Sequence, residues 1–76
     1  MTPEQYDARL AEKVAMWEKK NPDQAAELRL SVRRAAGLVA APPEGSFRAQ
    51  VLERYFWERV RELKGWPTER EWMRSA

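Results

Sequence analysis

Apolar residues recur every three or four positions along most of this chain, which is the spacing of one face of an α-helix. No segment alternates apolar and polar residues with the period of two that a half-buried β-strand requires. Short polar residues, prolines and glycines separate the periodic segments and mark helix ends. The pattern predicts helices at residues 3–20, 22–36, 47–64 and 69–75, with a loop at residues 37–46.

Four residues with short polar side chains stand just before the periodic segments, where N-caps are needed: Thr2, Asn21, Ser46 and Thr68. Their side-chain oxygens can accept hydrogen bonds from the free backbone N–H groups of a first helical turn. Gly65 follows the third segment, and glycine readily takes the left-handed conformation that commonly ends a helix. We therefore expect four separate helices with well-defined ends.

Each of the three long helices carries one apolar stripe that can face a common core. The stripes are Tyr6, Leu10, Val14 and Trp17 in the first helix, Ala25, Leu28, Val32, Ala35 and Ala36 in the second, and Ala49, Leu52, Phe56, Val60 and Leu63 in the third. We expect the stripes to meet, with the short last helix covering one end through Trp72 or Met73. The sequence thus predicts an all-α domain over residues 1–76, a small three-helix bundle with a short fourth helix.

Several large apolar residues lie outside these stripes. Consecutive helical residues point about 100° apart, so the run Tyr55-Phe56-Trp57 cannot fit within one buried stripe. Trp57 stands among charged neighbours on the helical wheel, and we expect it to be at least partly exposed. The surplus residues are Leu30 on the second helix and Phe47, Val51, Tyr55 and Trp57 on the third.

The surplus apolar residues favour a surface that binds another protein, because tryptophan, tyrosine and arginine are enriched where binding energy concentrates. The expected interface comprises Leu30, Phe47, Val51, Tyr55, Trp57 and Arg61. A homodimer that pairs the third helix with its own copy would bury Tyr55 or Trp57. In the competing interpretation, the last helix and the loop fold back over Phe47, Val51 and Tyr55, while Trp57 lies over neighbouring alkyl stems.

Charge is nearly balanced, with fourteen basic residues against twelve acidic ones and a net charge of +2. A nucleic-acid-binding protein usually shows a clustered basic excess, whereas acidic residues are interspersed here. We expect little binding to duplex DNA at physiological salt. Nucleic-acid binding is nevertheless the alternative function, and it would use arginines of the second and third helices: Arg29, Arg33, Arg34, Arg48 and Arg54.

The chain contains neither cysteine nor histidine, so it has no disulfide, thiolate nucleophile or imidazole base. Glu58 and Glu62 are paired carboxylates, but they lie on an arginine-rich helix face with no sign of a cleft. No glycine-rich phosphate loop or calcium-binding loop is present. We expect no enzyme activity, no cofactor, no bound metal and no small-molecule substrate.

No apolar run approaches the roughly 18 residues of a membrane span, and no signal-peptide pattern opens the chain. We therefore expect a cytoplasmic protein with no membrane partner. The sequence favours a small interaction module or regulator that docks an apolar helix face onto a larger protein or onto a second copy of itself.

Overall fold

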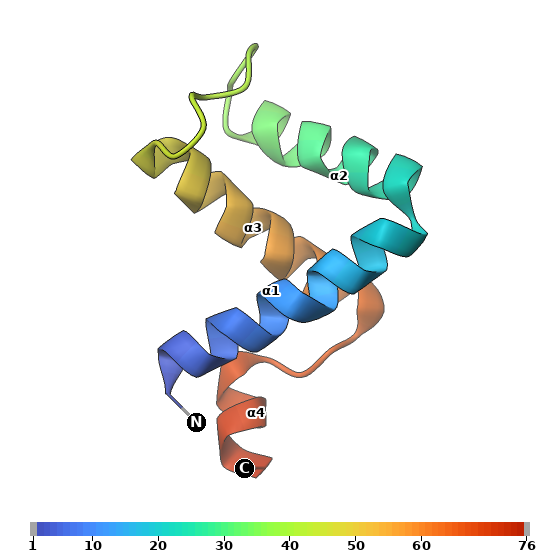
Figure 1. Cartoon of the computed structure of the whole chain (residues 1–76), viewed down its shortest axis with the longest axis vertical. Helices are drawn as coiled ribbons and strands as arrows, with labels where there is room; N and C mark the ends of the chain where they lie inside the picture. The colour runs from blue at the N-terminus through green and yellow to red at the C-terminus, as the bar shows by residue number, and fades with distance from the viewer. Residues whose placement is uncertain (1, 76) are drawn as a thin grey trace.

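The structure, a computed structural model, describes residues 2–75, and that part of the chain holds four helices and no strand (Figure 1). The helices are α1 (Pro3–Lys20), α2 (Pro22–Ala35), α3 (Phe47–Lys64) and α4 (Glu69–Ser75). The predicted all-α fold is confirmed, and α2 ends one residue earlier than expected. Within the described range, no helix is both long enough and apolar enough to cross a membrane.

Most of the expected capping residues act as predicted. Thr2 Oγ1 accepts a hydrogen bond from the Gln5 backbone N–H, and Gln5 Oε1 accepts one from the Thr2 N–H at 2.8 Å, which completes a capping box. Ser46 and Thr68 each accept a hydrogen bond from the backbone N–H three residues further on. Gly65 ends α3 in the left-handed conformation, with a φ of 69°.

Asn21 caps a different helix from the one expected. Its side-chain Nδ2 donates a hydrogen bond to the Trp17 carbonyl oxygen at 2.9 Å, so it completes the C-terminus of α1. Helix α2 starts at the next residue, Pro22, without a side-chain hydrogen bond at its N-terminus. Proline suits this first position because it has no N–H to satisfy and its φ is already helical. A single residue therefore separates α1 from α2.

Helices α2 and α3 lie side by side with opposite chain directions, while α1 crosses α3 and meets the N-terminal end of α2 (Figure 1). The contacts of α1 with α3 involve residues between Arg54 and Val60 of α3. Helix α4 packs against α1, where the rings of Trp72 and Tyr6 meet edge to face with centroids 5.6 Å apart. Beyond the crossing, the C-terminal part of α2, the connecting loop and the N-terminal part of α3 form what we call the far end.

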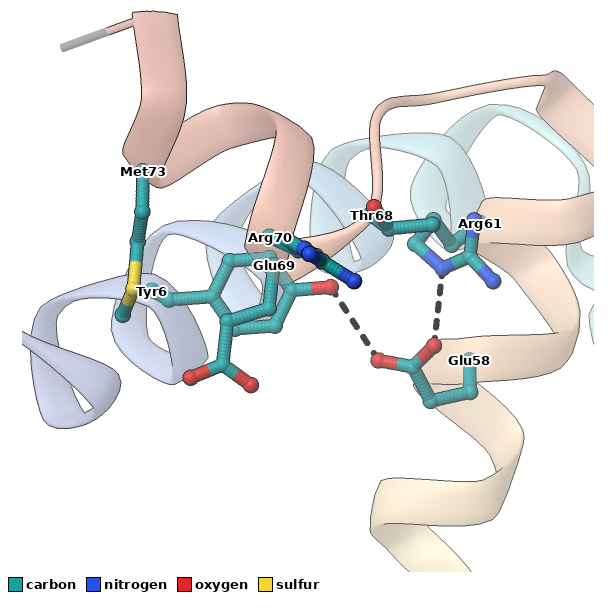
Figure 2. Close-up of a pocket in the computed structure, with 7 residues that line it drawn as sticks. All are labelled: Tyr6, Glu58, Arg61, Thr68, Glu69, Arg70 and Met73. Carbon is teal, nitrogen blue, oxygen red and sulfur yellow. Dashed lines mark hydrogen bonds and ion pairs between the residues drawn. The ribbon is translucent and has the colours of Figure 1, made fainter.

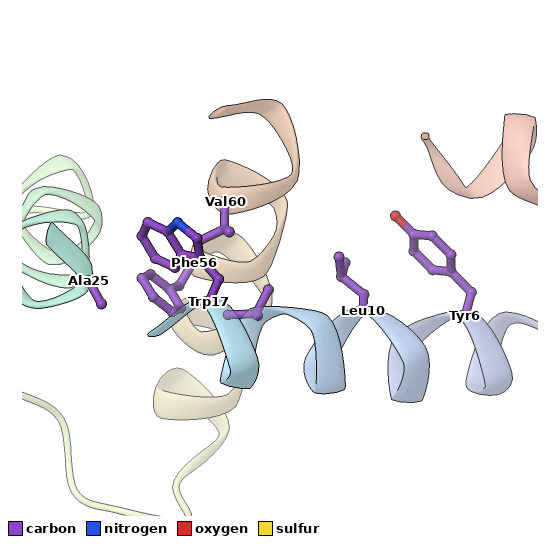
Figure 3. Packing of buried hydrophobic residues seen from close by; sticks show 7 residues of the cluster. Tyr6, Leu10, Trp17, Ala25, Phe56 and Val60 are labelled. Atoms are coloured by element: carbon purple, nitrogen blue, oxygen red, sulfur yellow. The ribbon is translucent and has the colours of Figure 1, made fainter. Parts of the chain in front are cut away.

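The buried core runs along α1, from Trp17 beside α2 and α3 to Tyr6 near α4 (Figure 3). Its members come from all three long helices: Tyr6, Leu10, Val14 and Trp17 of α1, Ala25 of α2, and Phe56 and Val60 of α3. The expected α1 stripe is thus confirmed in full. Trp66 and Trp72 pack against the core from the C-terminal segment, and the Lys13 ammonium lies within 5.1 Å of both ring centroids. The prediction that Trp72 covers one end of the bundle is therefore confirmed.

The expected core stripes of α2 and α3 are buried only in part. Ala35 and Ala36 are exposed, and Leu63 remains 55% exposed. The reason is that α1 crosses α3 and meets only the N-terminal end of α2 instead of running along the pair (Figure 1), so it covers only a short length of each stripe. The prediction that the three stripes meet in one core was wrong for Ala35 and Ala36 at the far end, where no third helix of residues 2–75 completes the layer, and for Leu63 near the C-terminus of α3.

Candidate protein-interaction surface

The side of α3 that faces away from α1 is apolar and open. Helix α1 packs against Phe56 and Val60, whereas Tyr55 and Arg59 each lie one residue earlier and point about 100° away. A groove of about 330 Å³ runs between α2 and α3 on this side. We call it the outer groove, and it is lined by Val32, Ala35 and Ala36 of α2 and by Leu52, Tyr55 and Arg59 of α3.

A second groove of about 310 Å³ lies on the other side of the same two helices. The segment from Ala41 to Glu44 forms part of its wall and closes it in part. Val32 and Leu52 line both grooves, so these two side chains separate the two sides of the molecule at the far end. The far end is therefore a two-helix layer, closed on one side by the loop and open on the other.

Tyr55 lies at the centre of the open side. Its side chain lines the outer groove and a neighbouring hollow formed with Val51, Arg54 and Glu58. Tyr55 is 61% exposed, and Phe47, two turns earlier on α3, is 80% exposed. Neither the loop nor α4 covers these two rings, because α4 packs on α1. The competing interpretation, in which both segments fold back over them, was wrong.

Trp57 is half-buried and thus partly exposed, as predicted, but it does not stand apart from the core. Its ring packs against the core cluster, and its Nε1 donates a hydrogen bond to Glu53 Oε1 at 3.2 Å. Leu30 of α2 is half-buried as well and does not line the outer groove. Both residues therefore lie outside the open surface that contains Tyr55.

The Arg61 side chain, which was expected at the interface, makes hydrogen bonds within the protein instead (Figure 2). This side chain is only 14% exposed; its Nε donates to Glu58 Oε2 at 2.7 Å and its Nη1 donates to the Trp66 carbonyl oxygen. The other Glu58 oxygen accepts a hydrogen bond from the Tyr6 hydroxyl at 3.1 Å. Burial and the neighbouring Glu58 carboxylate raise the pKa of Tyr6 to about 12. This cluster joins α1 to α3 and leaves Arg61 little freedom to bind a partner.

Arg29 connects all three long helices. From α2 it donates hydrogen bonds to both carboxylate oxygens of Glu18 on α1, at 2.9 and 3.0 Å, and to both oxygens of Glu53 on α3. Its guanidinium carbon lies 4.0 Å from the centre of the Phe56 ring. These paired hydrogen bonds raise the pKa of Arg29 above its already high ordinary value. Arg29 thus stabilises the helix crossing.

The other arginines of the nucleic-acid alternative are dispersed. Arg54 pairs with Asp7 at 3.1 Å, and Arg33 has a buried Nε without a hydrogen-bond partner. Arg34 and Arg48 are exposed, and none of the ion pairs among residues 2–75 includes either of them. The structure therefore does not gather the five arginines into one free basic surface.

The Arg29–Glu53 contact predicts how stability depends on pH. Hydrogen bonds from Arg29 lower the pKa of Glu53 below its ordinary value of 4.5. A lowered native pKa means that this stabilisation is fully present above the unfolded pKa and is lost as the pH falls through the native one. We expect the midpoint of urea denaturation to fall as the solution is acidified below about pH 4.5. Glu53→Gln should flatten this dependence, and an unchanged slope in that variant would contradict the assignment.

Comparison of the chain with protein-family models, with curated proteins and with solved structures gives no match. The candidate surface therefore rests on the geometry of this chain. The sequence predicted Val51 and Tyr55 as surface residues, and Phe47 is exposed but does not line the groove. The sequence did not predict the α2 wall of the groove, since Val32, Ala35 and Ala36 were assigned to the core. It did contain one indication that this end of the α2 stripe would stay exposed: the stripe ends in two alanines, which offer little apolar area to bury.

Proposed function

We propose that this protein is a small, non-catalytic interaction module that binds a protein partner through the outer groove and the adjoining Tyr55 and Val51. We call these residues together the outer face. The observation that carries the proposal is the position of Tyr55, which is 61% exposed and lies between the outer groove and the neighbouring hollow. A large exposed aromatic side chain beside an apolar groove is typical of the residues that dominate binding energy.

The architecture favours a helical partner. At the crossing, α1 supplies the third helix that buries the apolar sides of α2 and α3. At the far end no segment of residues 2–75 does this on the outer side, and the outer groove lies between two helices. A helix laid along such a groove would bury Val32, Leu52 and Tyr55 in the way that an amphipathic helix fills a groove on its receptor.

The charge distribution supports a protein partner over a nucleic acid. Arg29 is engaged with Glu18 and Glu53, and Arg54 with Asp7. Of the five arginines of the nucleic-acid alternative, Arg34 and Arg48 are exposed and belong to none of the ion pairs of the described residues. Two charges are few, because nucleic-acid affinity depends on neutralising several phosphates at once. The lack of histidine and cysteine in the sequence supports the non-catalytic part of the proposal.

Site-specific photo-crosslinking tests this proposal. A photoreactive phenylalanine analogue at position 55 should form a defined adduct in an extract of the source cells or in the purified protein. Unlabelled protein should suppress the adduct, whereas an equal amount of the Tyr55→Ala variant should not. Because Tyr55 is exposed, we expect this variant to retain its fold within about 1 kcal/mol.

Met16 provides a matched control, because it is 64% exposed but lies on α1, away from the outer face. The same photoreactive group at position 16 should give no adduct that unlabelled protein suppresses. Equal labelling from positions 16 and 55, or equal competition by Tyr55→Ala and the unchanged protein, would overturn the proposal.

A further inference from the structure

Building on the proposed function, we infer that the partner of the outer face is a second copy of this chain. Two α3 helices would pair in opposite directions about a two-fold axis that passes beside Tyr55. Closed two-fold symmetry is the commonest arrangement of soluble homo-oligomers, and it requires a surface that is complementary to itself. The outer face meets this requirement in its charges and in its shape.

The charges are complementary about Tyr55. Helix α3 runs from Phe47 to Lys64, so Tyr55 lies at its middle. Arg48 stands seven residues before Tyr55 and Glu62 seven residues after it. Seven residues are almost two full turns, so both side chains point within about 20° of the direction of Tyr55. In an antiparallel pair each Arg48 therefore lies opposite Glu62 of the other copy.

The local ion pairs leave room for this contact. Both Arg48 and Glu62 are exposed, and none of the ion pairs of the described residues includes Arg48. Glu62 accepts a hydrogen bond from Arg59 at 2.9 Å through Oε2, and its Oε1 lies 3.8 Å from Arg61 Nη2. Because a carboxylate has about four lone-pair sites, Glu62 can still accept from a further guanidinium group. Two symmetric Arg48–Glu62 contacts would fix the register and direction of pairing more than they would add affinity.

The apolar residues are complementary as well. Leu63 lies near the C-terminus of α3 and is 55% exposed, although it belongs to the apolar stripe of α3 that was expected to face the core. Antiparallel pairing brings that end of one α3 beside the N-terminal half of the other, where the outer groove lies between α3 and the C-terminus of α2. In the register that places Arg48 opposite Glu62, Leu63 of each copy would lie opposite Phe47 of the other, which is 80% exposed. The two Tyr55 rings would meet at the axis.

The size of the surface sets the expected affinity. The chain exposes 5718 Å² in total, and specific interfaces bury about 800 Å² on each partner, with weak ones burying less. A helix of 18 residues and one groove provide an area at the lower end of this range. We therefore expect a dissociation constant on the order of micromolar, so that the dimer forms at high protein concentration.

Disulfide trapping tests the symmetric contact directly, because the chain contains no cysteine. In the antiparallel register Arg48 of one copy lies opposite Glu62 of the other, so the double variant Arg48→Cys/Glu62→Cys should give a covalent dimer as the main product of mild oxidation at tens of micromolar protein. Met16 is exposed on α1, and Met16→Cys should form a covalent dimer at least tenfold more slowly. Equal rates for the two variants would overturn the inference.

Charge reversal tests the register. Arg48→Glu should weaken dimerisation about tenfold in sedimentation equilibrium, and Glu62→Arg should weaken it similarly. The double variant Arg48→Glu/Glu62→Arg should regain most of the original affinity, since both contacts are restored with reversed charges. Arg34→Glu changes an exposed arginine outside the outer groove and should have little effect. Failure of the double variant to recover would show that the antiparallel register is wrong.

The two proposals fail in distinguishable ways. If the protein stays monomeric at hundreds of micromolar while position 55 still forms a specific adduct with another protein, the second copy is excluded and the interaction module stands. If position 55 gives no specific adduct and Arg48→Cys/Glu62→Cys gives no covalent dimer, both proposals are wrong.

Discussion

Replacing Phe56 by alanine is expected to remove most of the protein's stability at room temperature. Phe56 is 1% exposed and lies in the core where the three long helices meet, with the Arg29 guanidinium against its ring. Truncation of a buried phenylalanine costs about 3–5 kcal/mol, and a whole domain is stabilised by only about 5–15 kcal/mol, with short chains near the lower limit. Thermal denaturation followed by circular dichroism at 222 nm measures the loss.

Phe47→Ala is the matched control, because it removes the same side chain from the same helix. Phe47 is 80% exposed, so we expect a change within about 0.5 kcal/mol. If the two variants lost similar stability, either α3 would be rotated relative to this structure or Phe47 would be buried in an oligomer. Repeating the measurement at low micromolar concentration separates these explanations, because only the second depends on concentration.

Loss of Arg29 is expected to have the second largest effect. Arg29→Ala removes hydrogen bonds to Glu18 and Glu53 and the stacking on Phe56. Hydrogen bonds to charged groups contribute about 1.5–3 kcal/mol when they are shielded, while exposed ion pairs contribute less than about 1 kcal/mol. Arg29 is partly shielded, so we expect a loss of about 2–3 kcal/mol in urea denaturation.

Two variants show whether this effect comes from the geometry of the guanidinium. Arg29→Lys keeps the charge but cannot donate paired hydrogen bonds to two carboxylates, so it should recover less than half of the loss. Arg54→Ala removes a single exposed pair with Asp7 and should change stability by less than about 1 kcal/mol. Full recovery by lysine would mean that charge alone matters at this position.

These stability variants bear on the proposed interface. The core at the crossing and the Arg29 contacts join α2 to α3 away from the far end, and Val32 and Leu52 line both grooves at the far end. The outer groove thus depends on the crossing for its shape although no residue of α1 lines it. A variant that loosens the crossing should weaken binding indirectly, which is why Tyr55→Ala is the better probe of the surface itself.

The sequence alone determined the helices and their ends. Thr2, Ser46 and Thr68 cap helices through hydrogen bonds to residues three positions away, and Gly65 ends α3 through its own backbone conformation. Such interactions are local, so they can be read from neighbouring residues without knowing the tertiary structure. Helical periodicity likewise placed the whole α1 stripe in the core and left Phe47 and Tyr55 off the buried stripe of α3.

Only the tertiary structure decided how far each stripe is buried and which charges meet. Periodicity gives the direction of a side chain around its helix, but not the angle or position at which another helix crosses it. The crossing of α1 leaves Ala35, Ala36 and Leu63 exposed although their direction is that of core residues. The same crossing brings Glu18 and Glu53 to Arg29 from separate helices. These contacts join residues distant in the chain, so they depend on the packing of whole helices and not on local sequence.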